Sequence, residues 1–333
     1  MQVFIVSMLV CAILILLLRS VAQRLDIVDR PGGRKQHGYS TPTVGGLAMF
    51  IAVLAALFIG DAVHGNVATL LGCAAVLVVL GVLDDKHGLS VSMRMMIQVF
   101  LVSVVIVGAG GEVTHLGAMF GRDIPLGMFA IPFSVIAFVG GINATNMIDG
   151  MDGMAGKMAL ITTLGVAAIF YLAGAVELLP LTWAMLGALV GFLLFNSRLF
   201  VKRAWVFMGD AGSMWLGLVL GWFMAQVTRG AVSAEPALVL WLFGIPLSDT
   251  LVVMARRLKR KQSPFAADRT HIHHVLEHAG LSVRRTVLVL SGVQMAMVGI
   301  GVIFYLMHAP AAVVFWSFVL LMAAYYYRLR NYQ

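Results

Sequence analysis

Residues 143–156 read NATNMIDGMDGMAG, a polar stretch set between long apolar segments. Its amides and carboxylates, Asn143, Asn146, Asp149 and Asp152, recur at every third position. Because residues three or four apart share one face of a helix, these side chains could form a single polar stripe. Three glycines on neighbouring positions, Gly150, Gly153 and Gly156, would let another backbone or a ligand approach closely. Polar groups are costly beside lipid, so the stretch predicts a functional site at a membrane, with a plain membrane-surface loop as the alternative.

The composition indicates an integral membrane protein. The 333 residues are 61% hydrophobic and 11% charged, with a mean hydropathy of +0.96. Apolar runs recur along the chain, each long enough to cross roughly 30 Å of hydrocarbon as a helix. We therefore predict one all-α integral-membrane domain over residues 1–333, a polytopic protein with about eleven transmembrane helices. The expected spans are 2–18, 44–60, 67–83, 95–110, 125–140, 158–175, 181–196, 212–228, 236–254, 287–306 and 310–326.

Lys and Arg are distributed unevenly between the two sides of the predicted bundle. Of the 23, 21 lie in segments that follow odd-numbered spans, and only Arg122 and Arg229 follow even-numbered ones. Because cytoplasmic loops carry the excess of basic residues, we predict the N-terminus outside and the C-terminus in the cytoplasm. A count of ten spans would break this alternation. The net charge of +8 is thereby explained as a topology signal, and no nucleic-acid partner is predicted.

Two adjacent carboxylates, Asp84 and Asp85, follow the third predicted span. Neighbouring carboxylates repel, and holding both near lipid is costly unless they share a proton or a cation. Oxygen ligands of this kind suit a hard divalent ion such as Mg²⁺. The alternative is a pair of helix-end charges that only set topology, a role that basic residues normally fill.

A tight turn, VFMGDAGS at residues 206–213, opens the eighth predicted span. Glycines lie on both sides of Asp210, which places one carboxylate beside a helix N-terminus. This arrangement suits a metal ion bridged to phosphate, with the backbone N–H groups on the phosphate. Phe207, nearby, could stack on a nucleobase, although packing is the simpler interpretation of a single phenylalanine.

Basic and histidine side chains occur in two further segments on the predicted cytoplasmic side. Lys35 and His37 precede a glycine-initiated span, where helix N–H groups could hold an anion; contact with anionic lipid is the alternative. His271, His273 and His274 cluster in the largest loop. The His-Glu-x-x-His zinc spacing and nearby cysteines are lacking. Hydrogen bonds to phosphate oxygens are therefore favoured over zinc, with a structural role as the alternative.

Taken together, aspartates, histidines and Lys/Arg side chains at one membrane face are typical of phosphoryl transfer assisted by a divalent cation. A site at the membrane edge indicates one lipid-borne substrate and one phosphorylated cytosolic substrate. No P-loop or kinase glycine loop occurs, so ATP is not indicated. The rival class is a transporter with a carboxylate relay. Transport sites tend to lie near the bilayer midplane, whereas the interiors of the predicted spans are nearly free of charge.

The chain resembles the polyprenyl-phosphate N-acetylhexosamine-1-phosphate transferase family. The motifs that carry the resemblance occur in order across nearly the whole sequence: DRPGGRKQH, PTVGG, LGVLDDKHGLS, NATNMIDGMDGMAG, VFMGDAGS, IPLSDT and HIHH. Any one of them is weak evidence, but the ordered set is specific. The HIHH form and the eleven predicted spans are similar to the branch that uses UDP-N-acetylglucosamine rather than to the peptidoglycan branch.

The resemblance implies that the chain transfers N-acetylglucosamine-1-phosphate from UDP-N-acetylglucosamine to undecaprenyl phosphate. UMP would leave, and the lipid-pyrophosphoryl sugar would start the synthesis of a cell-envelope glycan. The site would lie at the cytoplasmic face of the bacterial inner membrane, with Mg²⁺ as cofactor and Mn²⁺ as a substitute. A homodimer is compatible with this resemblance. Another UDP-N-acetylhexosamine, or UDP-N-acetylmuramoyl-pentapeptide, is the alternative donor.

The same resemblance implies roles for individual residues. Asp210 is the best candidate for a metal ligand and Asp152 the second. Asp84 and Asp85 position or deprotonate the lipid phosphate, or help to hold the metal. Positioning is favoured, because a phosphate whose second pKa is about 6 is mostly dianionic at neutral pH. Asn146 and Asp149 would order the nucleotide and the metal shell. The implied substrate-binding residues are Lys35, His37, Asn143, Asn146, Phe207, Arg257, His271, His273 and His274.

Overall fold

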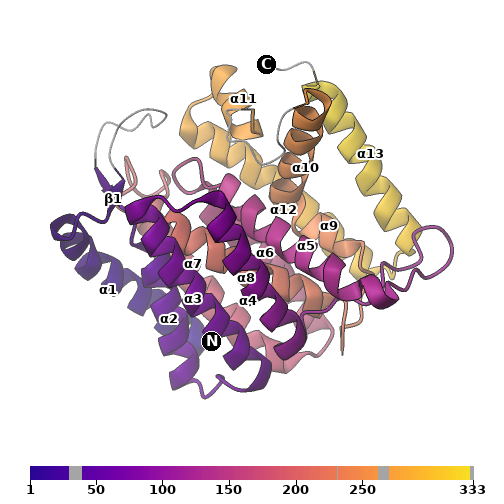
Figure 1. Ribbon diagram of the computed structural model, residues 1–333, viewed down its shortest axis with the longest axis horizontal. Helices are drawn as coiled ribbons and strands as arrows, with labels where there is room; N and C mark the ends of the chain where they lie inside the picture. The colour runs from indigo at the N-terminus through magenta and orange to yellow at the C-terminus, as the bar shows by residue number, and fades with distance from the viewer. Residues whose placement is uncertain (30–39, 231, 262–269, 331–333) are drawn as a thin grey trace.

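The computed structural model describes the chain except for residues 30–39, 231, 262–269 and 331–333 (Figure 1). In the described part, two short strands, β1 (Val28–Asp29) and β2 (Thr41–Pro42), form an antiparallel pair. The α-helices are α1 (Gln2–Arg24), α2 (Gly45–Ile59), α3 (Gly65–His87), α4 (Val91–Gly108), α5 (Ala130–Met147), α6 (Met154–Leu172), α7 (Leu179–Asn196), α8 (Gly209–Val227), α9 (Leu238–Leu242), α10 (Gly244–Lys259), α11 (Ile272–His278), α12 (Val283–Leu306) and α13 (Ala311–Leu329). Two 3₁₀ turns, Gly127–Phe129 and Val176–Leu178, precede α5 and α7.

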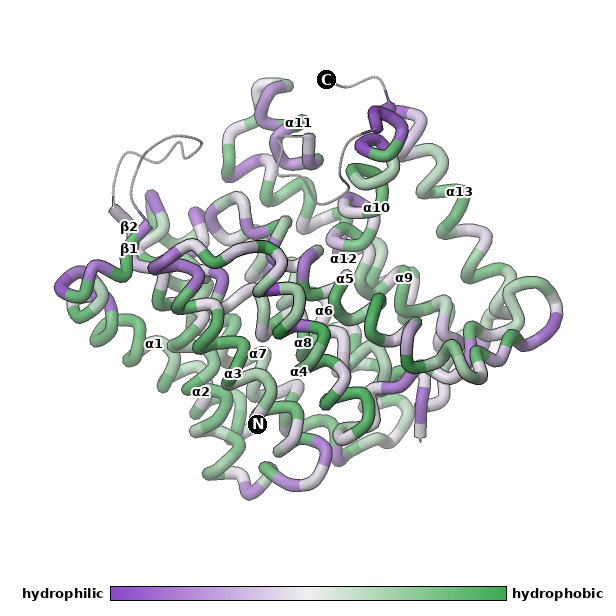
Figure 2. The backbone as a smooth tube through the Cα atoms, in the orientation of Figure 1, coloured by the Kyte–Doolittle hydropathy of each residue, from purple (hydrophilic) through white to green (hydrophobic). Residues whose placement is uncertain are grey.

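Within the described residues, eight helices are long and apolar enough to cross a membrane: α1, α3, α4, α5, α6, α7, α12 and α13. The prediction of a helical, multi-pass membrane protein is confirmed. Apolar residues follow the helices, and polar residues gather toward their ends and connections (Figure 2). The other three predicted spans fall on α2, which has 15 residues, on α8, and on the pair α9 and α10. The count of eleven spans and the sidedness of the termini stay predictions.

The central helix of the bundle is α8, which begins with Gly209 and Asp210. Nearly all of its later side chains are buried, and it packs against α2, α3, α5 and α6. Glycines allow two of these contacts, because a Cβ on Gly46 would overlap the backbone of Gly212 and a Cβ on Gly81 would overlap that of Ala211. The first turn of α8, which carries Asp210, is therefore fixed by direct backbone contact with α2 and α3.

This close contact predicts a large difference between two glycine substitutions on α3. Gly81→Ala should lower the free energy of unfolding by about 1–3 kcal/mol, because the added methyl group forces α3 away from α8. Gly72→Ala is the matched control, since a Cβ there meets nothing within 4 Å. Thermal unfolding of both variants in detergent measures the effect. Equal unfolding temperatures would contradict the tight crossing.

The ninth predicted span, 236–254, is divided in two at Phe243. The fully buried side chain of Gln294, on α12, satisfies the backbone at this break. Its Oε1 accepts from the Ile245 N–H at 2.8 Å, and its Nε2 donates to the Leu242 carbonyl at 3.0 Å. Thr162 donates to the same carbonyl at 3.0 Å. Irregular backbone is tolerated at membrane depth where neighbouring helices supply such partners, and a pattern of apolar residues does not reveal them.

Candidate active site

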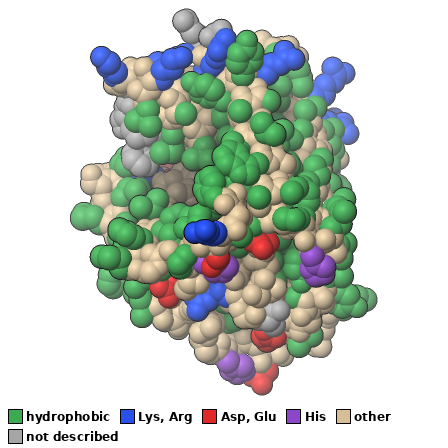
Figure 3. Space-filling model, turned by 90° about the vertical axis from the view of Figure 1, so that its right-hand side faces the viewer, with side chains coloured by type: hydrophobic (Ala, Val, Ile, Leu, Met, Phe, Trp, Pro, Cys, Tyr) green, Lys and Arg blue, Asp and Glu red, His purple; other side chains and the backbone are tan. Residues whose placement is uncertain are grey.

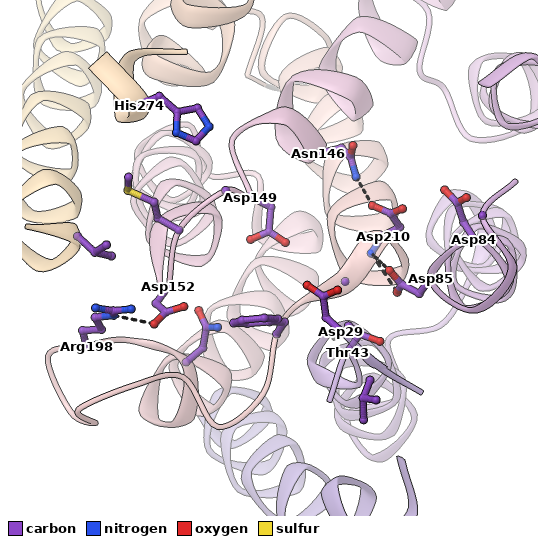
Figure 4. A pocket seen from close by; sticks show the side chains of 18 of the residues that line it. Asp29, Thr43, Asp84, Asp85, Asn146, Asp149, Asp152, Arg198, Asp210 and His274 are labelled. Atoms are coloured by element: carbon purple, nitrogen blue, oxygen red, sulfur yellow. Dashed lines mark hydrogen bonds and ion pairs between the residues drawn. The ribbon is translucent and has the colours of Figure 1, made fainter. Parts of the chain in front are cut away.

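A pocket of about 1040 Å³ lies where the C-terminal ends of α3, α5 and α7 meet the first turn of α8 and the side of α11 that carries His274 and His278 (Figure 4). These segments are far apart in the sequence. The predicted site residues that line the pocket are Asp84, Asp85, Asn146, Asp149, Asp152, Phe207, Asp210 and His274. The structure thus places all five of the predicted catalytic aspartates in the lining of one pocket, while their individual roles stay predictions.

Asp210 is held by a side chain from α5 and lies near one from α4. Asn146 donates to Asp210 Oδ1 at 2.6 Å and to the Ser213 hydroxyl at 2.8 Å. The guanidinium of Arg94 lies 3.7 Å from Asp210 Oδ2. Hydrogen bonds to a charged carboxylate are among the stronger ones in proteins, so the orientation of Asp210 is well defined.

Asp85 caps the N-terminus of α8 from another helix. The backbone N–H of Asp210 donates to both Asp85 oxygens, at 3.0 and 3.1 Å. A carboxylate in this position satisfies a free N–H and is favoured by the helix dipole. Gly209, just before it, has a left-handed φ of +72°, and a Cβ there would overlap Asp85. The turn at residues 208–210 is thus shaped to receive the Asp85 carboxylate.

Asp84 faces Arg94 and the turn between α3 and α4. It is only 6% exposed, and it accepts from the Leu89 N–H and from Arg94, both at 2.7 Å. Arg94 therefore stands between Asp84 and Asp210. The sequence analysis did not assign Arg94 to the site, because the residue precedes the predicted span 95–110. In the structure α4 begins at Val91 and therefore contains Arg94.

Asp152 joins the turn between α5 and α6 to the connection between α7 and α8. Its Oδ2 accepts from Arg198 Nε at 2.7 Å and from the Ala204 N–H at 3.3 Å. In Figure 4, Asp149 lies between Asp152 and the group formed by Asp84, Asp85 and Asp210. Arg198 and Asp29 also line the pocket. Neither was predicted, and the only sequence signal for Asp29 is its place at the start of the DRPGG motif.

Negative charge is concentrated in this pocket, as the raised pKa of Asp149 indicates. Burial, reinforced by the carboxylates of neighbouring aspartates, raises the pKa of Asp149 to about 8. No three His, Cys, Asp or Glu side chains of the described residues are already arranged as a metal-binding group. Mg²⁺, however, usually takes one or two carboxylates and completes its shell with water and substrate phosphates. Asp210, with Asp85 beside it, fits a divalent ion held in that manner.

The three predicted histidines differ in their surroundings. His274 lines the pocket, with its Nδ1 3.6 Å from the Glu277 carboxylate. His273 is 1% exposed, and burial, followed by neighbouring His274, lowers the pKa of His273 to about 3. A neutral, enclosed imidazole is poorly suited to binding phosphate. His271 is also buried, and its Nδ1 donates to Asp249 Oδ2 at 2.7 Å.

Other predicted substrate-binding residues lie away from the pocket or outside the described residues. Asn143 donates to Gln98 Oε1 at 3.0 Å and to the Val139 carbonyl at 2.8 Å. Arg257 is 2% exposed on α10. Neither belongs to the described lining of the pocket. Lys35 and His37 fall in the range 30–39, which the structure does not describe.

Known proteins are similar to this sequence over most of its length. Residues 67–228 match the model of the family described as "Glycosyl transferase family 4". The undecaprenyl-phosphate alpha-N-acetylglucosaminyl 1-phosphate transferase of Yersinia pestis is 35% identical over 85% of this chain and 78% of its own length. The protein of that name from Escherichia coli K12 is 33% identical over 94% of this chain and 86% of its own.

A further relative has a similar name. The probable undecaprenyl-phosphate N-acetylglucosaminyl 1-phosphate transferase of Bacillus subtilis is 33% identical over 86% of this chain and 80% of its own length. The identity therefore extends well beyond the part of the chain that matches the family model. On this evidence the chain belongs to glycosyl transferase family 4, among the polyprenyl-phosphate N-acetylhexosamine-1-phosphate transferases.

Proposed function

We propose that the protein transfers N-acetylglucosamine-1-phosphate from UDP-N-acetylglucosamine to undecaprenyl phosphate. The observation that carries the proposal is the convergence of five aspartates on one pocket, in a chain whose relatives are named for this reaction. An oxygen of the lipid phosphate attacks the β-phosphorus of the nucleotide sugar. The bond between that phosphorus and the bridging oxygen breaks, and UMP leaves with the oxygen. One pyrophosphate linkage forms as another is broken, so the reaction is near thermoneutral and reversible.

Asp210 is the proposed first ligand of Mg²⁺, with Mn²⁺ as a substitute. When bound, the divalent ion neutralises charge on the diphosphate and on the group being transferred. Asn146 keeps Asp210 oriented through its 2.6 Å hydrogen bond. Asp85 holds the start of α8, and so the position of Asp210, from α3. Asp152 remains the second candidate ligand, although Arg198 and a backbone N–H already share its Oδ2.

The acceptor and the nucleotide are proposed to bind on different walls of the pocket. Lipid phosphate is mostly dianionic at neutral pH because its second pKa is about 6, so no strong base is needed. Asp84 therefore helps to position the lipid phosphate and does not act as a base, and it does so by orienting Arg94. Phe207, which lines the pocket, offers a ring for uracil. Asp149 orders the nucleotide and the shell of the ion, and His274 contacts the diphosphate or the sugar.

The pocket is proposed to open to the cytoplasm at the bacterial inner membrane. Most Lys and Arg side chains on the face shown in Figure 3 gather at one end, with a hydrophobic belt below them. This is the end at which α11 lies in Figure 1. Loops rich in Lys and Arg remain on the cytoplasmic side of membranes. A C-terminus in the cytoplasm and an N-terminus outside follow from the same rule.

The proposal is tested by UMP release from a panel of donors. Purified protein with Mg²⁺, undecaprenyl phosphate and UDP-N-acetylglucosamine should release UMP, and omission of the acceptor should abolish release. Parallel reactions with UDP-N-acetylgalactosamine and with UDP-N-acetylmuramoyl-pentapeptide identify the preferred donor. A stronger reaction with either would reassign the donor but keep the reaction class. No UMP from any of the three would refute the proposal.

A further inference from the structure

We propose that Asp249 is a positioning residue that clamps α11 onto the pocket and links it, through Tyr325, to the C-terminal helix α13. The carboxylate of Asp249 is 3% exposed on α10. Its Oδ2 accepts from His271 Nδ1 at 2.7 Å. Its Oδ1 accepts from the Ile272 N–H at 2.9 Å and from the Tyr325 hydroxyl at 3.1 Å. Because a carboxylate only accepts hydrogen bonds, the proton of this histidine lies on Nδ1.

The α11 helix needs such an anchor because it is short. It has 7 residues, and the His271 side chain at its N-cap makes no capping hydrogen bond. Helices of this length are unstable unless tertiary contacts hold them. Asp249 caps the helix from α10 by accepting the Ile272 N–H. A second contact from α10, Arg256 to the Thr270 carbonyl at 3.1 Å, holds the residue before the helix.

A second contact of α11 is with the turn that carries Asp149. His273 is buried there, and a Cβ on Gly150 would lie only 2.5 Å from its Nε2. Directly after these two attachments in the sequence, His274, Glu277 and His278 line the pocket. In Figure 4, His274 lies on the side of the pocket away from Asp84, Asp85 and Asp210. The position of these three side chains therefore depends on a carboxylate that does not itself line the pocket.

Asp249 differs from the five predicted catalytic aspartates because it is not part of the described lining of the pocket. Both of its oxygens are engaged, by donors from the start of α11 and from α13. Buried carboxylates whose hydrogen bonds are satisfied in this way mainly stabilise the structure, and removal of one partner is strongly destabilising. Loosening α11 should weaken binding of the substrate that reaches His274, and should leave the requirement for the divalent ion unchanged.

Tyr325→Phe tests the clamp with minimal disturbance, because it removes one hydroxyl from a residue that is not part of the described pocket lining. Tyr327→Phe is the matched control on the same helix, since Tyr327 is 63% exposed. Hydrogen–deuterium exchange of residues 271–279 should rise in Tyr325→Phe and stay at the wild-type level in Tyr327→Phe. With the proposed function as the assay, the KM for UDP-N-acetylglucosamine should rise about 2- to 10-fold, the range for one hydrogen bond, with kcat nearly unchanged.

Asp249→Asn should show a larger rise in KM, because its amide nitrogen cannot accept the His271 proton. The double variant Asp249→Asn/His271→Ala should have a KM close to that of Asp249→Asn alone, since both changes remove the same hydrogen bond. Equal exchange over 271–279 in Tyr325→Phe and Tyr327→Phe would overturn the proposal, as would a lower unfolding temperature with an unchanged KM. If wild-type protein released no UMP from any donor, the proposed function would fail while the exchange comparison still decided the clamp.

Discussion

Asp210→Asn is expected to lower the rate of UMP release at least about 100-fold, the loss typical when one group that stabilises transition-state charge is removed. The amide keeps the size of the side chain, and one oxygen can still accept from Asn146, as Asp210 Oδ1 does at 2.6 Å. It loses the negative charge that would balance a divalent ion. The measurement is kcat in detergent at saturating donor and acceptor.

Asp61→Asn is the matched control for this substitution. Asp61 lies between α2 and α3, at the opposite end of α3 from the pocket, and its side chain is 94% exposed. The control variant should keep wild-type turnover. Near-normal turnover in Asp210→Asn would reject the metal role of Asp210, and an equal loss in both variants would show that the effect is not specific to the pocket.

Removal of divalent metal should have an effect of similar size. EDTA is expected to lower turnover at least about 100-fold, because the diphosphate then enters a pocket of carboxylates without a counter-charge. Burial and neighbouring carboxylates already raise the pKa of Asp149 to about 8, which reflects that repulsion in the protein alone. Added Mg²⁺ should restore the rate, and Mn²⁺ should replace it.

The metal prediction has its own internal control. Restoration should follow the concentration of free divalent ion and should not occur with an equal ionic strength of KCl. In Asp210→Asn, added Mg²⁺ should not bring the rate back to that of the wild type. Full turnover in excess EDTA would contradict the assignment of a divalent cofactor. Recovery of turnover with KCl alone would show that the effect of Mg²⁺ is a general salt effect.

Much of the fold could be predicted because apolar length is a strong signal for membrane helices. The division of the ninth span could not, since it depends on Gln294 from α12, 49 residues after Ile245. The length of α3 was also underestimated. The helix continues through Asp84 and Asp85 to His87, where the Asp84 carboxylate accepts the N–H of Leu89 beyond the helix end.

The residues of the site could largely be predicted from the sequence, but the hydrogen bonds and ion pairs between them could not. Motifs placed five aspartates together, and all five line the pocket. Arg94 and Arg198 were missed, because a basic residue near a membrane face normally indicates topology. His271 and His273 resemble phosphate ligands in the sequence, yet both are buried. Their burial depends on Asp249 and Gly150, 22 residues or more before them, and local sequence does not reveal such contacts.

The most direct test follows the β-phosphate of the donor. UDP-N-acetylglucosamine labelled with ³²P at the β-position is incubated with the protein, Mg²⁺ and undecaprenyl phosphate, and the lipid and nucleotide products are separated. Transfer of the sugar phosphate predicts that the label enters the lipid as a pyrophosphate and that the released nucleotide is unlabelled UMP. Labelled UDP, with a lipid that carries only its original phosphate, would contradict the account.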